Sequence, residues 1–308
     1  MLQSRKIDEC LPFGACVDGL TLDMVENSEL QKELKQLWIK ESLLLFRDCP
    51  ANPDFHVALG KCFGELLIHP GEHIRLKGNP ELVQFTADPE QEGIYRVDGV
   101  DRVGWIPWHA DLAWATESNR GGLLRAITIA SEGGETGFMS RFDIYDRMPE
   151  PLKLAAEGRE IVTRIRNAYE TNPYCIGQHA ELQYKPEHIA ESELRLMASN
   201  PPTAHPLVAV QAETGRKFLN FSPAGADRVL GMSAAESHEL LSAIALYAND
   251  DNKAYRHHWR LGEYILWDNW VINHKAYGCP LGEERVMQRA TLPSDGKQVK
   301  GRPILEDA

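Results

Sequence analysis

The sequence predicts a mainly β protein, a β-sandwich or jelly roll with flanking α-helices, for three reasons. Short apolar runs of strand length recur along most of the chain, separated by glycine, proline and polar turn residues. Helical patterns occur only at a few places before and between these runs. No repeat, low-complexity tract or linker interrupts the 308 residues. Short strands bury their apolar faces by stacking in two sheets, so we expect one domain over residues 1–308.

Three segments carry helix signals. Asn27 or Ser28 can cap a helix that extends to about residue 40. A second helix fits residues 52–63, and Gly64 stands where a helix commonly ends. Residues 233–236 are spaced as a capping box, which predicts a third helix through about residue 248.

Strand-like runs account for most of the remaining apolar sequence. We expect strands at residues 43–46, 82–86, 108–114, 123–130, 160–165, 205–210, 217–221, 264–268 and 285–292. A hairpin turn is expected at residues 213–216. Two long stretches, residues 88–107 and 171–202, show neither pattern, and we expect them to be loops or lids over a site.

The composition limits the partners and the location. The formal net charge of -12 and the lack of a lysine or arginine cluster argue against nucleic-acid binding. No window has the roughly 18 uninterrupted apolar residues of a membrane span, and the first residues lack the apolar core of a secretion signal. The six cysteines are scattered without a Cys-x-x-Cys pair, so no disulfide framework or thiolate zinc site is expected. We therefore expect a cytoplasmic protein with reduced thiols.

One expected strand, Trp-His-Ala-Asp-Leu-Ala-Trp at residues 108–114, places two metal-capable side chains in an apolar run. In a strand, residues i and i+2 point to the same side, so His109 and Asp111 are expected to project together. Two histidines and one carboxylate can hold Fe(II) on one face of an octahedron and leave the other positions open. His-x-Asp alone also fits a hydrogen-bonded pair at a strand end, so the metal interpretation requires a third ligand.

A histidine that can complete the set lies near the other end of the chain, where Trp-Asp-Asn-Trp-Val-Ile-Asn-His places His274 after another buried strand. With these motifs the chain resembles the taurine/2,4-dichlorophenoxyacetate dioxygenase superfamily of Fe(II)- and 2-oxoglutarate-dependent oxygenases. The resemblance spans nearly the whole chain. It rests on six motifs in the family's order: FGELLIHP (63–70), WHAD (108–111), GGETGF (133–138), NPPTAHPLV (200–208), WRLGEYILWDNWVINH (259–274) and RVMQRATL (285–292).

The resemblance implies a double-stranded β-helix core, a cupin-like jelly roll, with an iron site made by His109, Asp111 and His274. It also implies that Thr136 and Arg285 bind the distal carboxylate of 2-oxoglutarate, which suits a hydroxyl donor and a planar, permanently charged fork. The implied cofactor is Fe(II), and the implied cosubstrates are 2-oxoglutarate and O2. The implied chemistry is oxidative decarboxylation of 2-oxoglutarate to succinate and CO2, coupled to hydroxylation of an unactivated C–H bond or to cleavage that follows hydroxylation.

A second arginine, Arg289, follows Arg285 by four residues. In a strand the two would lie about 13 Å apart, so one carboxylate cannot contact both. In the resembled enzymes this arginine meets the anionic group of the substrate or lies beside the keto-acid end, and His69 matches a histidine that contacts the anion. We therefore expect a small substrate with a carboxylate, sulfonate or sulfate group near His69 and Arg289. A structural histidine is the alternative for His69.

Aromatic side chains suit a larger or more apolar substrate body. Trp105, Trp114 and Phe221 are the candidates, with core packing as the alternative for each. Gly71 and Glu72 replace the aromatic that follows His-Pro in the taurine enzyme, and residues 99–107 also differ from its pattern. These departures put taurine itself in doubt as the substrate.

The same residues bear on several other functions. Asp111 argues against halogenation, because halogenating relatives lack the carboxylate and leave its position to chloride. The alternative enzyme is a tailoring oxygenase that hydroxylates or desaturates an amino acid or a carrier-bound natural-product intermediate. A noncatalytic binding protein with this fold is disfavoured by the intact site, and a zinc hydrolase explains neither Thr136 nor Arg285.

Two further expectations concern assembly and ligand support. Relatives commonly form dimers or tetramers, so we expect a homo-oligomer. Asp268 and Asn269 are expected either to form a turn or to orient metal ligands through hydrogen bonds.

Overall fold

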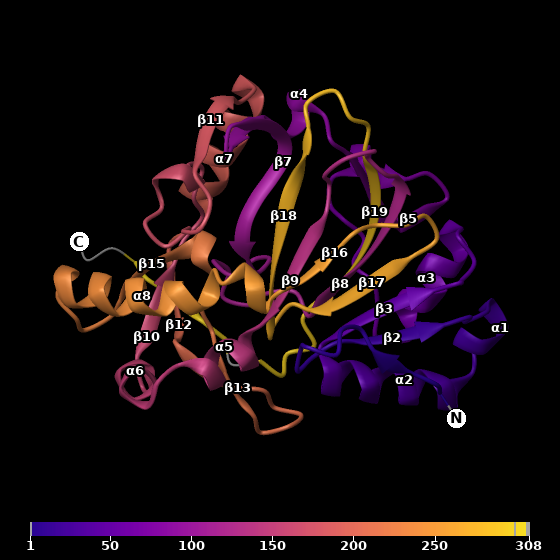
Figure 1. Cartoon of the computed structure of the whole chain (residues 1–308), viewed down its shortest axis with the longest axis horizontal. Helices are drawn as coiled ribbons and strands as arrows, with labels where there is room; N and C mark the ends of the chain where they lie inside the picture. Colours follow the sequence, from indigo (N-terminus) through magenta and orange to yellow (C-terminus); the bar gives the residue numbers. More distant parts are fainter. Residues whose placement is uncertain (1, 299, 306–308) are drawn as a thin grey trace.

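The computed structural model describes residues 2–298 and 300–305, and two large sheets dominate it (Figure 1). The larger sheet has eight strands, in spatial order β1 (Arg5–Lys6), β2 (Ala15–Asp18), β3 (Leu43–Arg47), β17 (Tyr264–Asp268), β8 (Gly121–Thr128), β19 (Val286–Leu292), β5 (Asn79–Thr86) and β4 (Arg75–Leu76). The second sheet has six strands, in spatial order β11 (Ala180–Tyr184), β6 (Ile94–Val97), β7 (Val100–His109), β18 (Ile272–Pro280), β9 (Thr136–Ser140) and β16 (Tyr255–His257). Both sheets keep two edge strands, so they do not close into a barrel.

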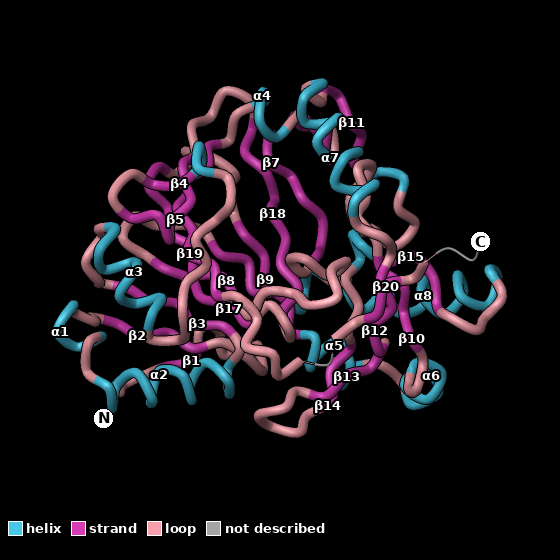
Figure 2. The backbone as a smooth tube through the Cα atoms, turned by 180° about the vertical axis from the view of Figure 1, so that it is seen from behind, coloured by secondary structure: helices cyan, strands magenta, loops and turns pink. Residues whose placement is uncertain are grey.

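Smaller sheets and helices surround this pair (Figure 2). One small sheet has the order β15 (Ala226–Val229), β10 (Glu160–Thr163), β12 (Thr203–Pro206) and β20 (Arg302–Pro303), and another pairs β13 (Val208–Val210) with β14 (Lys217–Leu219). The α-helices are α1 (Leu22–Val25), α2 (Ser28–Glu41), α3 (Pro53–Lys61), α4 (Pro89–Glu92), α5 (Arg141–Arg147), α6 (Glu150–Ala156), α7 (Glu187–Ser199) and α8 (Ala234–Ala248). Short 3-10 turns are η1 (Glu72–Ile74), η2 (Tyr169–Thr171), η3 (Pro223–Gly225) and η4 (Asp251–Lys253).

Local side chains set the helix starts. The Asn27 side chain accepts hydrogen bonds from two backbone amides at the start of α2, and Asn52 accepts one at the start of α3. Ser233 and Glu236 form the expected capping box of α8. The three helices predicted at 27–40, 52–63 and 233–248 are thereby confirmed, although α3 ends at Lys61, before the glycine expected to end it.

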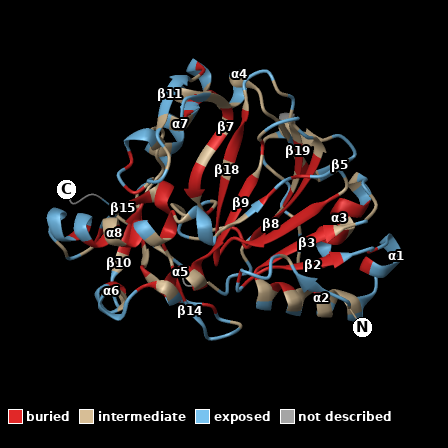
Figure 3. Cartoon of the chain, viewed as in Figure 1, coloured by how far each residue is buried: buried red, intermediate tan, exposed pale blue. Residues whose placement is uncertain are grey.

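The main core lies on both faces of the larger sheet, as the alternation along β3 shows. Leu44 and Phe46 pack on the face covered by α2 and α3, whereas Leu43 and Leu45 pack toward Phe138 of the second sheet. Figure 3 shows the central strands of both sheets mostly buried, with exposed residues on edge strand β11 and on the outer helices and loops. Two stacked sheets with flanking helices are the architecture that the strand pattern predicts.

The strand predicted at residues 108–114 is wrong in its second half. Strand β7 ends at His109, and residues 111–114 form a turn in which Leu112 takes a left-handed conformation, with φ of 52°. The ladder stops there because the next two amides bind side chains: Ala110 N donates to Ser222 Oγ and Asp111 N to Asn269 Oδ1. The run predicted as one strand at 205–210 is also divided, between β12 and β13.

The prediction that residues 88–107 are irregular is also wrong. The segment contains α4, β6 and most of β7, and Asp98 and Gly99 join the two strands with φ of 49° and 85°. Two left-handed residues in an Asp-Gly pair form the turn that matches the twist of a hairpin, and this signal was missed in the sequence. The hairpin turn predicted at 213–216 is confirmed, because it joins β13 and β14.

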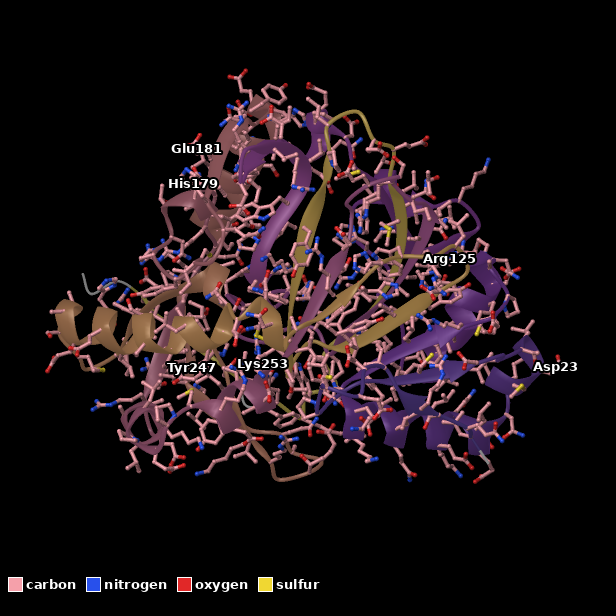
Figure 4. All side chains as sticks on the ribbon, in the orientation of Figure 1. Asp23, Arg125, His179, Glu181, Tyr247 and Lys253 are labelled. Carbon is pink, nitrogen blue, oxygen red and sulfur yellow. The ribbon has the colours of Figure 1, made fainter. Side chains whose placement is uncertain are left out.

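Residues 171–202 likewise contain regular structure. They hold β11, which pairs with β6, and α7, which has no buried residue. The exposed side chains of His179 and Glu181 are labelled in Figure 4 and lie at this edge of the second sheet. His179 Nε2 lies 3.1 Å from Glu181 Oε1. Because so few of its side chains are buried, the segment has little of the alternation that predicts a strand. Its role as a lid stays a prediction.

No helix within residues 2–298 and 300–305 has the length and apolar content required to cross a membrane. All six cysteines lie within the described chain and are free thiols.

Candidate metal centre and its surroundings

Two of the three predicted metal ligands are placed by a β-ladder. Strands β7 and β18 lie side by side in the second sheet (Figure 1), and within this ladder His109 pairs directly with His274. Cross-strand partners point to the same face, and the two imidazole rings accordingly lie with their centroids 4.0 Å apart. His274 is buried and His109 is partly exposed. The backbone of the sheet therefore sets the spacing of the two histidines.

The third predicted ligand, Asp111, reaches the same place by a different route from the one expected. It lies in the turn after β7, so strand alternation is not what turns it toward the histidines. Its Oδ1 atom lies 3.7 Å from His109 Nε2 and 3.5 Å from His274 Nε2. One ligand atom from each residue can be chosen so that all lie within 4.8 Å of one another.

This donor set fits Fe(II). Two imidazoles and one carboxylate on one side of a site form the facial arrangement that leaves positions for other ligands. His109 Nδ1 lies 2.8 Å from the carbonyl oxygen of Pro107, which requires the proton on Nδ1 and leaves the Nε2 lone pair facing the site. His274 Nδ1 is buried without a hydrogen-bond partner in the described chain. The inward nitrogens and the carboxylate converge in a way that a bound cation would satisfy.

The surroundings of the site favour an ionised Asp111 carboxylate and an uncharged His274 imidazole. Burial would raise the pKa of Asp111, but the Arg289 charge and the two histidines hold it well below its usual value. Burial, assisted by His109, lowers the pKa of His274 to about 4. An anionic carboxylate and an uncharged imidazole are the protonation states that metal binding needs.

Each of the two predicted 2-oxoglutarate residues is hydrogen-bonded to a residue that lines the same cavity. Thr136 begins β9, and its Oγ1 accepts a hydrogen bond of 3.0 Å from Trp259 Nε1. Arg285 directly precedes β19 and donates from Nε to the carbonyl oxygen of Gly134 at 3.0 Å. Trp259, Gly134 and Arg285 line one cavity of about 270 Å³.

Gly134 is required at this position. It has φ of 75°, and a Cβ atom added to it would lie 3.0 Å from Arg285 Cδ. Any larger residue would strain the turn and displace the arginine.

A carboxylate that the sequence did not single out lies near Arg285. Burial raises the pKa of Glu92 to about 7, and attraction to Arg285 opposes that rise. The pKa of Arg285 is itself lowered by burial, and Glu92 is the largest charge acting against that decrease. Glu92 was hidden in a segment predicted to be irregular, and it carried no spacing signal toward Arg285.

Arg289 and Arg285 have different partners. Arg289 lies on β19 opposite Val83 and Leu124, and its Nη2 forms a short ion pair with Asp111 Oδ2. Its guanidinium carbon lies 4.9 Å from the centroid of the Trp267 ring. Arg289 therefore contacts the carboxylate of a predicted metal ligand, whereas Arg285 lines the cavity next to Gly134.

The remaining predicted substrate residues are more scattered. His69 is partly buried in an irregular segment, where its Nδ1 accepts from Gly71 N at 3.0 Å, and no hydrogen bond or ion pair joins it to Arg289 in the described chain. Trp114 is partly buried in the turn that carries Asp111. Trp105 and Phe221 are both buried.

Each of these two buried aromatics has protein neighbours that account for it. Trp105 packs on Tyr95 and donates to Gln178 Oε1 at 3.3 Å. Phe221 has no exposed surface and packs on Tyr174 within a core cluster, which favours the core-packing alternative. A substrate contact by either ring stays a prediction.

Comparison with known proteins agrees with this geometry. Residues 3–291 match the family model described as taurine catabolism dioxygenase TauD, TfdA family. The chain is 28% identical over 292 residues to an alpha-ketoglutarate-dependent 2,4-dichlorophenoxyacetate dioxygenase of Cupriavidus pinatubonensis, covering 92% of this chain and 95% of the relative. It is 25% identical to pentalenolactone F synthase of Streptomyces arenae, covering 90% and 91% of the two chains.

A solved structure shows the same fold. The crystal structure of a taurine dioxygenase from Burkholderia xenovorans superposes with a TM-score of 0.72 at 22% identity, covering 99% of this chain and 96% of the other. The predicted cupin-like jelly-roll core with flanking helices is confirmed by this match.

Proposed function

We infer that this chain, which belongs to the TauD, TfdA family of taurine catabolism dioxygenases, oxidises a C–H bond of a small organic anion. Its reaction class is that of an Fe(II)- and 2-oxoglutarate-dependent dioxygenase, with O2 as the second cosubstrate. The observation that carries the proposal is the convergence of His109, Asp111 and His274 from separate elements within 4.8 Å. The product is a hydroxylated substrate, or the fragments that form when hydroxylation next to a heteroatom leads to cleavage.

The roles of the side chains follow from their charge and position. His109, Asp111 and His274 would hold Fe(II), which when bound supplies the activation of O2 and the oxidation of 2-oxoglutarate and substrate. Arg285 and Thr136 would hold the distal carboxylate of 2-oxoglutarate by a charged fork and a hydroxyl. The Trp259 and Gly134 contacts keep these two groups oriented before the cosubstrate binds. The carboxylate of Asp111 supports oxygenation over halogenation.

The reaction class is tested by mixing the protein with Fe(II) and 2-oxoglutarate without oxygen. We expect a weak visible charge-transfer absorption from the ternary complex, with an intensity that saturates at one equivalent of each component. Fe(II) alone should give no such band. Protein that retains Fe(II) but gives no band on addition of 2-oxoglutarate would show that the assignment is wrong.

For the primary substrate we propose a carboxylate, sulfonate or sulfate ester bound near Arg289, with His69 as a second contact. The proposal is supported by the arginine's position beside the metal ligands and by the carboxylate in the substrate that names the Cupriavidus relative. A substrate anion would then compete with Asp111 for the same guanidinium. Substrate-dependent formation of succinate across sulfonates, sulfate esters, aryloxyalkanoates and amino acids would identify the compound class.

Replacing Arg289 by alanine is expected to weaken binding of that substrate about 10-fold or more, since a hydrogen bond to a charged group contributes roughly 1.5–3 kcal/mol. Binding of 2-oxoglutarate should weaken less. The two dissociation constants are measured with the metal site saturated, because Arg289 also contacts Asp111.

A matched control is Arg125→Gln on the neighbouring strand β8. Arg125 is a buried arginine that donates to Gln288 Oε1 and the Tyr264 hydroxyl, so its loss should lower stability without changing substrate affinity. A larger loss of 2-oxoglutarate than of substrate affinity in Arg289→Ala would instead assign Arg289 to the cosubstrate.

A second candidate is a tailoring oxygenase acting on a natural-product intermediate or an amino acid. It is supported by the similarity to pentalenolactone F synthase over 90% of the chain. The same panel, extended by natural-product intermediates, distinguishes it, because such an enzyme would form succinate with amino acids or those intermediates and not with simple sulfonates or aryloxyalkanoates. A noncatalytic role is disfavoured by the converged ligand set.

We further propose a single catalytic domain over residues 1–308 that works in the cytoplasm as a dimer or tetramer. Segments 88–107 and 171–202 are proposed to cover the substrate. The pairing of β6 with β11 supports the view that the two segments move together, because it joins them into one edge of the second sheet. No nucleic-acid or membrane partner is proposed, in keeping with the net charge of -12.

A further inference from the structure

We propose that Asn269 is a positioning residue that holds the metal-ligand turn, so that Asp111 faces the two histidines. The inference rests on the proposed function, because it assumes that the turn serves to place a metal ligand. The three ligands differ in what fixes them. His109 and His274 are paired in the β7–β18 ladder, whereas Asp111 lies beyond the last paired residue of β7. A ligand outside the ladder needs another constraint to keep its carboxylate in place.

Asn269 supplies that constraint through both ends of its side-chain amide. Its Oδ1 accepts from Asp111 N at 2.9 Å, and its Nδ2 donates to the Asp111 carbonyl oxygen at 2.9 Å. The same Nδ2 lies 3.0 Å from Asn119 Oδ1. The side chain is buried, so water does not compete for these bonds. Both backbone polar groups of one metal ligand are thus bound to one side chain.

The position of Asn269 in the chain gives this contact a second effect. Asn269 lies between β17 and β18, in the short connection that leads into the strand carrying His274. Its backbone N–H donates to the Arg120 carbonyl oxygen at 3.0 Å. The preceding residue, Asp268, forms a buried ion pair with Arg120 at 2.8 Å. The connection is therefore rigid, and Asn269 sets the Asp111 turn relative to β18, the strand that holds His274.

Arg289 and Asn269 act on different parts of Asp111. Arg289 binds Oδ2 of the carboxylate, while Oδ1 faces both imidazoles. Asn269 holds only the backbone of Asp111. The backbone contact persists whichever partner Arg289 takes, so the ligand stays in place when a substrate anion draws Arg289 away.

The test compares Asn269→Ala with the unchanged protein in two measurements. Hydrogen exchange of metal-free protein is expected to rise in residues 110–116, because the Asp111 amide loses its acceptor. Titration with Co(II), followed by its visible absorption, is expected to show a metal affinity lower by about 10- to 100-fold, the usual range for loss of an outer hydrogen-bond partner. The Co(II) spectrum should also change, reporting an altered ligand geometry.

Asn172→Ala is the matched control. Asn172 is also a buried asparagine that accepts one backbone N–H and donates to two carbonyl oxygens, and it contacts none of the three metal ligands. It should lower thermal stability by a similar amount without changing Co(II) affinity or spectrum. If Asn269→Ala does not fold, Asn269→Ser keeps a smaller hydroxyl and is expected to show the same two effects in weaker form.

The outcomes separate this inference from the proposed function. Unchanged Co(II) affinity in a folded Asn269 variant overturns the positioning role, whatever its stability. Equal losses of affinity in the Asn269 and Asn172 variants also overturn it, since the effect would then be a general loss of stability. If the unchanged protein binds no Co(II), the metal assignment fails and the positioning role falls with it, but increased exchange in residues 110–116 would still show that Asn269 holds the turn.

Discussion

Asp111→Asn is expected to lose metal binding almost completely, with an affinity for Fe(II) or Co(II) reduced by at least about 100-fold, beyond the usual effect of an outer hydrogen-bond partner. The substitution keeps the size of the side chain and removes its charge. The site would then offer a divalent cation two imidazoles and an uncharged amide, beside the Arg289 guanidinium that pairs with Asp111 in the unchanged protein. A positive charge without its counter-ion next to the metal position adds direct repulsion. Turnover of 2-oxoglutarate should be lost with the metal.

Thermal unfolding with and without Co(II) measures this effect without relying on activity. Binding stabilises the unchanged protein by about 2.7 kcal/mol when the metal is present at 100 times its dissociation constant, and the variant should show almost no shift. The control is Asp227→Asn, which also removes a carboxylate from an arginine cluster, with Arg164 at 3.0 Å and Arg166 at 3.1 Å. The control should keep the full metal-dependent shift. Equal shifts in Asp111→Asn and the unchanged protein would exclude Asp111 as a ligand.

Arg285→Gln is expected to raise the dissociation constant of 2-oxoglutarate about 30-fold or more, because truncating one member of a buried charge pair costs roughly 2 kcal/mol at least. Metal affinity should be retained, since Arg285 lines the cavity and donates to Gly134, and forms no hydrogen bond or ion pair with the three ligands in the described chain. Loss of the guanidinium would also remove the attraction that Arg285 exerts on Glu92, and the pKa of Glu92, already raised to about 7 by burial, should rise further. Arg285→Lys keeps the charge without the fork and should give an intermediate loss.

Anaerobic titration of the charge-transfer absorption with 2-oxoglutarate measures this prediction. Arg102→Gln is the matched control, because Arg102 also donates to a backbone carbonyl, that of Gly278 at 3.4 Å, and lies close to the neighbouring Gly133. The control should bind 2-oxoglutarate normally. If binding is weakened in Arg102→Gln and normal in Arg285→Gln, the carboxylate of the cosubstrate would have to be assigned to the other side of the Gly133–Gly134 turn.

The fold could be predicted well where the signal is local. Each of the three predicted helices has its cap where an asparagine or a capping box marked it, because a cap needs only residues three positions away. Strands β3 and β17 were recognisable as apolar runs because both their faces are buried, one by helices and one by the second sheet. Segments with few buried side chains, such as β11 and α7, carried no comparable signal.

The sequence indicated which three side chains converge, but not how the chain brings them together. The residue types and spacing of the His-x-Asp motif indicated a metal, but the alternation that was to align His109 and Asp111 does not extend past His109. The bonds that orient Asp111 come from residues 158 and 178 positions away in the chain. No local pattern specifies such partners. Glu92 was missed for the same reason, because its relation to Arg285 exists only in the folded chain.

The sequence by itself determined the two-sheet architecture and the helix starts. It also indicated the residue types of the candidate site, two histidines and one aspartate, and the family to which the chain belongs. Periodicity, caps and short motifs depend on neighbours within a few residues, so they can be recognised from the sequence alone. Only the tertiary structure decided that a turn, and not a strand, presents Asp111, that Arg289 pairs with it, and that Asn269 holds its backbone. Those contacts are set by the stacking of the two sheets, which brings together hydrogen-bond partners that have no fixed separation along the chain.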